Sequence, residues 1–273
     1  MLDFAVNIRS TWNNNVAASG TMTTLSNALR VLSLMSPGSP RLRVSEVARS
    51  LDLPKSSVSR LFKELTEGGF LEREEDRGFR VGPELFRLGV LYRMRLPAEV
   101  RVDEELQKLV HRHGATAYVG VLSGSDLVVL RRHEGSSPVR FIQEPGSTIP
   151  AYATAVGKAL LARLSNKDLT ALPRRLTCEG REVDMMREEL LRELETVRRQ
   201  GYAEFDDRLL GVGALGVAIQ VAPGRDLGFA LCFTRDSLVD AERHAIACEL
   251  RDVARSIGVL CDDPFWTISS IRS

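Results

Sequence analysis

Cations and small hydroxyl groups gather on one side of a short helical pattern between Lys55 and Lys63. The opposite side is apolar, because Val58, Leu61 and Leu65 recur at the spacing of one helix face. The polar side carries Lys55, Ser56, Ser57, Ser59, Arg60 and Lys63. Small hydroxyls let a helix backbone approach base edges in the major groove, while Lys and Arg neutralise phosphates and bond guanine acceptors. The pattern is typical of a helix that binds double-stranded DNA.

The segments around this pattern predict the elements that would hold it. Apolar spacing predicts one helix over 25–35 and a second over 44–51, and Asp52-Leu53-Pro54 predicts a tight turn before the third. Gly68-Gly69 ends the third helix, and residues 70–81 predict a hairpin that turns at Asp76-Arg77-Gly78. Three short helices followed by a hairpin form a winged helix-turn-helix pattern.

The hairpin carries its own charges. Arg77 and Arg80 are expected to reach a flanking phosphate or the minor groove. The same hairpin is also acidic, which limits how deeply it can insert; its acids are Glu72, Glu74, Glu75 and Asp76. A solvated helix face without a partner is the alternative interpretation of residues 55–63, and the neighbouring helix, turn and hairpin disfavour it.

Composition agrees with a globular protein in which only one part touches phosphates. The chain has 273 residues, 44% of them hydrophobic, and a net charge of +1. Residues 22–95 hold thirteen Lys or Arg against nine Asp or Glu, a net charge of +4, so the remainder carries −3. No apolar run has the length of a membrane helix, and residues 1–20 lack the layout of a signal peptide. We therefore expect a cytoplasmic protein without a membrane partner.

The remaining chain predicts a linker helix and then an α+β domain with an antiparallel sheet. Helices are expected over 83–95, around 102–110, over 155–164 and 186–200, and from Ser237, with Asp240 completing a capping box. Strands are expected over 117–122, 127–132, 215–221 and 227–234, with an extended piece near 139–142. The predicted domains are a flexible extension (1–21), the winged helix-turn-helix domain (22–82), the linker helix (83–97), a larger α+β domain (98–262) and a C-terminal tail (263–273).

Patterns for other chemistry are present but incomplete. Residues 211–216 spell G-x-G-x-x-G, yet no apolar strand precedes them and a strand pattern follows, which disfavours a dinucleotide site. Gly157-Lys158 lacks the remaining residues of a phosphate loop. The four cysteines and four histidines show no metal-ligand spacing, and no catalytic triad can be argued. We therefore expect no enzyme activity, no cofactor and no metal.

Three motifs in register resemble the IclR family of transcriptional regulators. Residues 53–61 (LPKSSVSRL) are similar to its recognition helix. Residues 154–162 (TAVGKALLA) are similar to its small-residue motif, and residues 197–203 (VRRQGYA) to its Gly-Tyr motif. Order and spacing agree from about Thr23 to Leu260, nearly the whole chain.

The resemblance implies a winged helix-turn-helix domain, a linker helix and a GAF-like effector domain. It also implies homodimers or tetramers that bind palindromic operators and respond to a small effector, commonly an aromatic or short-chain organic acid. Carried over by position, the effector site comprises Ile149, Ala155, Val156, Gly157, Asp206, Gly216, Cys232 and Thr234.

Two interpretations of the small residues at 155–157 remain open. A helix that starts there would present free N–H groups to an effector carboxylate, whereas tight packing of a helix on a sheet also requires small residues. Gly216 stands where the family often has cysteine. A glycine there either enlarges the pocket or removes a contact to the ligand, which leaves room for a bulkier ligand.

Other functions remain as alternatives. One is a nucleoid-type or constitutive DNA binder with a vestigial sensor domain. Another is a small-molecule-binding protein or enzyme that uses its winged helix only for protein interaction.

Overall fold

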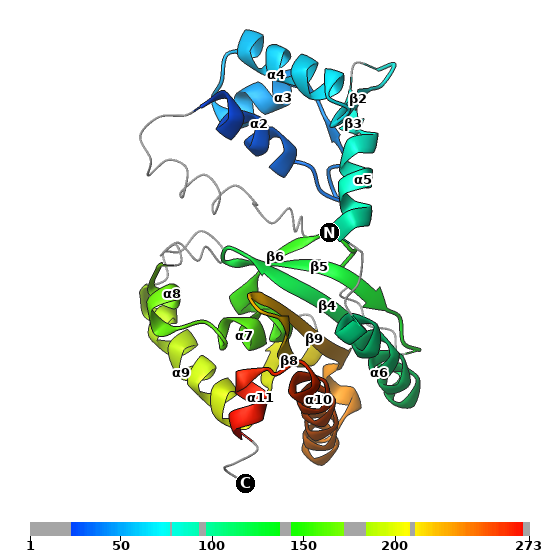
Figure 1. Ribbon diagram of the computed structural model, residues 1–273, viewed down its shortest axis with the longest axis vertical. Coiled ribbons are helices and arrows are strands. Elements are labelled where there is room, and N and C mark those ends of the chain that lie inside the picture. The colour runs from blue at the N-terminus through cyan, green and yellow to red at the C-terminus, as the bar shows by residue number, and fades with distance from the viewer. Residues whose placement is uncertain are drawn as a thin grey trace. The chain divides into compact units, whose positions relative to one another are not determined.

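The computed structural model of the chain describes residues 23–76, 78–92, 97–136, 143–171, 184–207 and 211–269. It divides into two compact units, Met1–Arg95 and Leu96–Ser273, here called the first and second unit (Figure 1). The expectations for residues 1–21, for the extended piece near 139–142 and for Arg77 fall outside the described residues. None of the described helices has the length and hydropathy of a membrane span.

The first unit is a bundle of short helices with a small three-stranded sheet. Its elements are α2 (Thr24–Ser33), β1 (Arg41–Leu42), α3 (Val44–Leu51), α4 (Lys55–Glu67), β2 (Leu71–Arg73), β3 (Phe79–Val81) and α5 (Pro83–Tyr92). The sheet order is β1-β3-β2, with antiparallel pairing. Its core consists of Val31, Leu42, Val47, Ala48, Leu51, Val58, Leu61, Phe62 and Leu71.

Two turns set the angle between its elements. Asp52 adopts a positive φ of 53° after α3, and its N–H donates to the Ala48 carbonyl, which ends α3 and lets α4 begin. Asp tolerates this left-handed conformation better than most residues do. Gly82 is required where the hairpin returns, because a Cβ there would stand 2.2 Å from the Gly69 carbonyl oxygen.

The second unit is a six-stranded antiparallel sheet with helices on both sides. Its strands are β4 (Thr116–Ser123), β5 (Asp126–His133), β6 (Thr148–Pro150), β7 (Ala203–Asp207), β8 (Val212–Ala222) and β9 (Arg225–Thr234), in the order β6-β5-β4-β9-β8-β7. Its helices are α6 (Pro97–His113), η1 (Ala151–Ala153), α7 (Ala155–Leu161), α8 (Asn166–Ala171), α9 (Asp184–Gln200), η2 (Arg235–Ser237), α10 (Asp240–Leu260) and α11 (Pro264–Ser269). The expected α+β class is confirmed.

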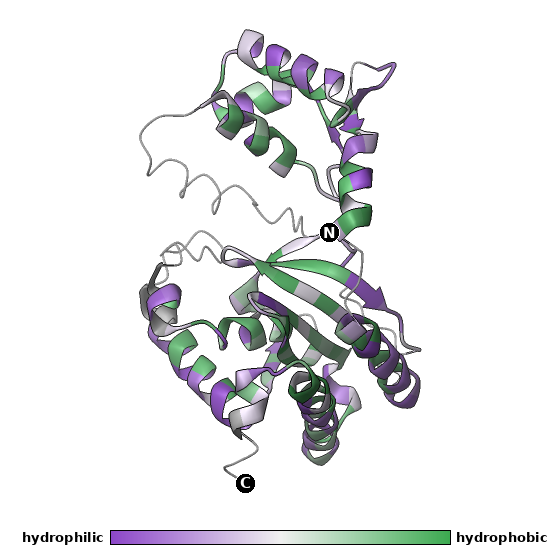
Figure 2. Ribbon diagram, in the orientation of Figure 1, coloured by the Kyte–Doolittle hydropathy of each residue, from purple (hydrophilic) through white to green (hydrophobic). Residues whose placement is uncertain are grey.

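Two hydrophobic layers lie on the two faces of this sheet. The α10 side includes residues of α6, α10 and α11, and the α7 side includes residues of α7, α8 and α9 (Figure 1). Figure 2 shows strand β4 as mostly hydrophobic and helix α6 as mostly hydrophilic, because α6 turns only one face inward. The dinucleotide-like motif at 211–216 enters strand β8 rather than a helix, so no helix N-terminus follows it.

The end of the chain differs from the expectation. Helix α10 begins at Asp240 rather than Ser237, and the Val239 N–H donates to Glu242 Oε2 at 3.0 Å, so the predicted capping box is wrong. Asp263 and Trp266 are buried, and the Trp266 indole N–H donates to the Ala218 carbonyl at 3.0 Å. Asp263 and Trp266, expected in a tail, are therefore packed into the second unit.

Candidate nucleic-acid interface and ligand-binding layer

Helix α4 turns its apolar side inward and its polar side outward. Val58, Leu61 and Phe62 are buried in the first unit's core, and the Phe62 ring meets that of Phe79 edge-on at 4.6 Å between centroids. This packing fixes the rotation of the helix about its axis. Among the DNA-binding residues expected on α4, Ser57 is half-buried and the others are exposed, namely Lys55, Ser56, Ser59, Arg60 and Lys63.

The cations of α4 are held weakly or not at all. Arg60 lies 3.9 Å from Glu64 and Lys63 lies 3.7 Å from Glu67, and all four side chains are more than half exposed. Exposed pairs of this kind contribute at most about 1 kcal/mol, so a phosphate can displace the carboxylate. Lys55 forms no ion pair with any described residue. The first turns of α4 therefore present cations and hydroxyls that a DNA duplex could bind.

The hairpin β2–β3 follows α4 and carries Arg80, whose Nε and Nη2 both donate to Glu72 Oε2 at 2.9 and 2.7 Å. Sequence reasoning missed two further arginines beside it, Arg41 and Arg43. The two-residue strand β1 has too short a pattern to reveal them, although basic residues flanking one apolar position, Arg41-Leu42-Arg43, were a faint signal. Both arginines are exposed over more than half of their side chains.

In the second unit, seven of the eight expected effector residues lie on the α7 side of the sheet. Ile149, Ala155, Val156 and Cys232 belong to or pack against its hydrophobic layer. Gly157 is buried in α7, and Gly216 faces the start of that helix. Thr234 follows Cys232 by two residues on β9 and so shares its side.

Asp206 lies on the other side of the sheet. Its neighbours on β7, Ala203 and Phe205, join the α7 layer, so strand alternation turns Asp206 toward α10. There it pairs with Arg235, and with Arg243 Nη1 at 3.3 Å. Burial alone would raise the pKa of Asp206, but the hydrogen bonds from the two arginines outweigh it and lower the pKa. The structure therefore does not bring Asp206 together with the other seven expected effector residues.

The small residues around α7 serve close packing. A Cβ at Gly216 would stand 2.6 Å from the Ala155 carbonyl carbon, so the enlarged pocket expected at Gly216 is filled by backbone. Val156 packs against β9, where a Cβ at Gly228 would stand 2.7 Å from it. The Gly157 N–H donates to Thr154 Oγ1 at 2.9 Å and is not free for an anion. These contacts favour the packing interpretation of residues 155–157.

The α7 layer also contains aromatic residues that sequence reasoning missed. Tyr118 is buried, and Tyr152 and Phe205 are half-buried against the same layer. The Gln143 N–H donates to Tyr118 Oη at 3.3 Å, and burial raises the pKa of Tyr118. Burial likewise raises the pKa of the Cys232 thiol to about 12, so the thiol stays protonated at neutral pH. Phe205 was missed because β7 has no hydrophobic alternation strong enough to predict a strand.

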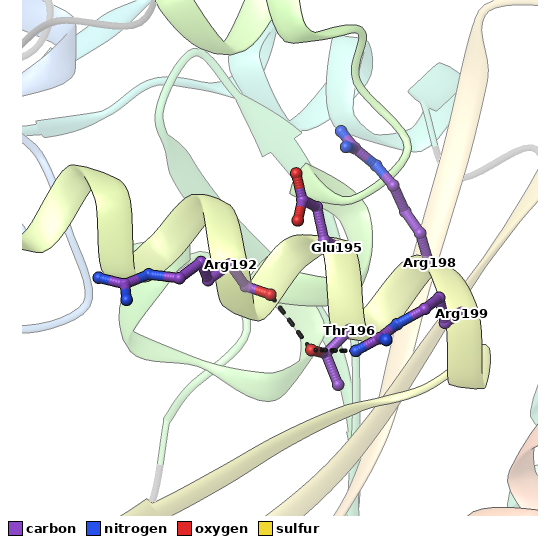
Figure 3. A pocket seen from close by; sticks show the side chains of 5 residues that line it. All are labelled: Arg192, Glu195, Thr196, Arg198 and Arg199. Carbon is purple, nitrogen blue, oxygen red and sulfur yellow. Dashed lines mark hydrogen bonds between the residues drawn. The ribbon is translucent and has the colours of Figure 1, made fainter.

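An open hollow of about 550 Å³ lies along α9 and contains none of the expected effector residues. It is lined by side chains of Arg192, Glu195, Thr196, Arg198 and Arg199 (Figure 3). The Thr196 hydroxyl donates to the Arg192 carbonyl and accepts from Arg199, each at 3.2 Å. Arg198 donates to the Ala162 and Leu164 carbonyls at 2.7 and 2.9 Å. These bonds hold the segment after α7 against α9.

Comparison with known families matches both units. The model described as the IclR helix-turn-helix domain matches residues 24–75. The model described as bacterial transcriptional regulator IclR C-terminal matches residues 91–259, more than half of the chain. The chain belongs to the IclR family. It is therefore a transcriptional regulator with a helix-turn-helix domain and an effector-binding domain.

Individual IclR relatives align over most of their length. The chain is 29% identical over 245 residues to the HTH-type transcriptional regulator BhcR of Paracoccus denitrificans, covering 88% of this chain and 87% of BhcR. It is 27% identical to the regulator XynR of Escherichia coli, and the match covers 78% of this chain and 86% of XynR. These relatives are named as regulators rather than enzymes.

Solved structures share the fold. An IclR-family regulator from Brucella abortus gives a TM-score of 0.74 at 22% identity and covers 89% of this chain and 94% of its own. An IclR homologue from Microbacterium hydrocarbonoxydans, complexed with 4-hydroxybenzoate, gives a TM-score of 0.68 at 21% identity. The match covers 87% of this chain and 98% of the homologue.

Proposed function

We propose that this IclR-family protein binds a palindromic operator in the cytoplasm through α4. In this proposal Lys55, Ser56, Ser57, Ser59, Arg60 and Lys63 face the major groove, while Arg77 and Arg80 lie at the wing. The observation that carries the proposal is the one-sidedness of α4, whose apolar residues are buried and whose cations and hydroxyls are exposed. Phosphate contacts from such a helix position it, and contacts to base edges specify the sequence.

The test is binding to DNA fragments from the protein's own genome at several salt concentrations. Specific binding that weakens steeply with salt is expected, and failure to recover any specific fragment would contradict the proposal. Arg60→Ala should weaken operator binding about tenfold without changing the fold. Arg101→Ala, which removes an exposed arginine of α6 in the second unit, is the matched control and should bind as the wild type does.

We infer that operator binding requires a homodimer or a tetramer built from it. Helix α5 has no buried residue although most of it is apolar, and Phe86, Val90 and Leu91 are 73%, 46% and 52% exposed. An exposed apolar helix face in a soluble domain is typical of a protein interface. A second copy is the partner that a palindromic operator requires, because two-fold symmetric DNA pairs with a two-fold symmetric protein.

We propose an aromatic acid as the effector, bound in the α7 layer of the second unit. The layer is apolar with aromatic members, Tyr118, Tyr152 and Phe205. The Microbacterium homologue carries 4-hydroxybenzoate in the same fold. Such a function requires no catalysis, cofactor or metal.

A thermal-shift titration tests the effector class. Benzoate and 4-hydroxybenzoate should raise the Tm of the protein, whereas 4-hydroxybenzyl alcohol, which lacks the carboxylate, should not. A response to short-chain acids alone would replace the aromatic class with the aliphatic one. No response to either class would favour a regulator without an effector.

A further inference from the structure

The outer face of the wing sheet carries a row of opposite charges. Arg41 on β1 is paired with Arg80 on β3, and Arg80 is paired with Glu72 on β2, so the three side chains share one face of the sheet. The inner face carries Leu42, and Phe79 packs there against the core. The charges are therefore directed away from the core by the strand register.

Three exposed arginines, Arg41, Arg43 and Arg80, each lie within ion-pair distance of a carboxylate of the β2–β3 hairpin. Arg80 donates twice to Glu72 Oε2, at 2.9 and 2.7 Å. Arg41 Nε lies 3.0 Å from Glu74 Oε2, and Arg43 Nη2 lies 3.3 Å from Asp76 Oδ2. The side chains are nonetheless exposed, by 65% at Arg41, 56% at Arg43 and 59% at Arg80. An approaching phosphate can therefore reach all three.

The hairpin holds these carboxylates in place. Asp76 Oδ1 accepts from the Gly78 N–H at 3.0 Å, and that bond, together with the hydrogen bond from Arg43, lowers the pKa of Asp76. The Glu74 side chain, near the same turn, is only 18% exposed. Asp76 therefore remains charged at neutral pH, and the Glu74 side chain is largely enclosed where it lies beside Arg41.

The wing and α4 differ in their balance of charge. Between Lys55 and Lys63 the helix has three cations and no acid, whereas residues 71–81 have four acids against three arginines, which are Arg73, Arg77 and Arg80. A duplex that approaches the first unit meets positive charge at α4 and internally neutralised charge at the wing. Sequence-independent affinity for DNA grows with the number of phosphates that cations neutralise.

We propose that the carboxylates of Glu72, Glu74 and Asp76 reduce non-specific DNA affinity by occupying the wing arginines that would otherwise bind phosphates. The proposal rests on DNA binding by the first unit. Its consequence is specificity: weaker attraction to any duplex leaves the base contacts of α4 a larger share of the binding free energy.

Glu72 offers the cleanest test, because it is 40% exposed and Glu72→Gln keeps its shape. Binding to a random-sequence duplex is measured by fluorescence anisotropy from about 50 to about 200 mM salt. Glu72→Gln should tighten binding about threefold or more at the low-salt end and steepen the salt slope by about one, the effect of one added phosphate contact.

Two controls separate a local effect from a change in net charge. Glu104→Gln changes the chain's charge equally at an exposed position of α6 in the second unit and should leave binding unchanged. Adding Arg80→Gln to Glu72→Gln should remove the gain, because no freed guanidinium remains. Circular dichroism melts check that each variant folds as the wild type does.

The outcomes separate this proposal from the function on which it rests. If the wild type binds DNA and Glu72→Gln matches Glu104→Gln, or if the gain survives Arg80→Gln, the wing proposal is overturned and operator binding stands. Weaker binding by a folded Glu72→Gln would also overturn it, since the carboxylate would then be positioning Arg80 for DNA. Absence of binding by every variant would overturn both.

Discussion

At Gly216 the backbone of β8 lies against the first turn of α7, and a Cβ built there would stand 2.6 Å from the Ala155 carbonyl carbon. Gly216→Ala should therefore lower the free energy of unfolding by about 1–3 kcal/mol, because neither backbone can give way cheaply. Urea denaturation measures this loss. Gly89→Ala, in a helix position with nothing within 4 Å, should be neutral or slightly stabilising; equal stability of both variants would contradict the close approach.

Close packing around Val156 means that a larger side chain there would disturb the fold as well as any bound ligand. Val156 is 4% exposed and fills the space above Gly228, so Val156→Trp would overpack the α7 layer. The variant should lose stability, so a lost effector response would not by itself place the effector at this residue. Cys232→Ala, which removes a half-buried side chain of the same layer, is a gentler probe of ligand binding.

Asp206 makes the second unit sensitive to acid. Its folded pKa is lowered, so its stabilising contribution is present above the unfolded value near pH 4 and is lost as pH falls through the folded pKa. Asp206→Asn should cost up to about 1 kcal/mol at pH 7, a small figure because the side chain is 37% exposed.

The measurement is urea denaturation of the wild type and Asp206→Asn from pH 7 downward. The difference in stability should shrink below about pH 4 and vanish near pH 2. Asp236→Asn, at 86% exposure beside the same Arg235, should show almost no difference at any pH. A constant difference for Asp206→Asn across pH would show that its charge is not responsible.

Among the elements, α11 contributes more than its six residues suggest. Trp266 is 1% exposed, contacts the α10 layer and donates to the Ala218 carbonyl of β8. Arg163 bonds the buried Asp263 at 2.7 Å, and Asp263 Oδ2 accepts from the Gln220 N–H at 2.8 Å. The short helix thereby closes the edge of a hydrophobic core.

Trp266→Ala should cost about 3–5 kcal/mol through the cavity it leaves. Trp266→Phe keeps most of the ring but loses the indole N–H bond and should cost roughly half as much. Chemical denaturation followed by far-UV circular dichroism measures both. If the two variants lose equally little, α11 is not part of the core.

On the scale of the whole molecule, the two units have separate cores, and no buried residue of one belongs to a cluster of the other within the described residues. The proposed sites are divided in the same way, with cations and hydroxyls on α4 and an apolar aromatic layer beside α7. Coupling between operator and effector then requires that the effector bind two states of the protein with different affinity.

Assembly provides a test at this scale. For the dimer proposed above, Phe86→Asp should shift the sedimentation velocity of the protein toward that of a monomer, because a charge on the exposed apolar face of α5 opposes its burial. Operator affinity should fall at least about tenfold as the second half-site contact is lost. Leu260→Asp, at an exposed apolar residue of α10, should change neither; an unchanged mass for Phe86→Asp would place the interface elsewhere.

The sequence by itself determined the winged helix-turn-helix order, the polar face of α4 and the α+β class of the second unit. These follow from local periodicity, which the side-chain directions of helices and strands impose on neighbouring residues. Tertiary structure decided the rest. The register of β7 on β8 turned Asp206 to the α10 side, contact with α7 filled the space beside Gly216, and β1 brought Arg41 and Arg43 to the wing. These features depend on pairing between segments far apart in the chain, and a shift of one residue in a strand reverses its faces.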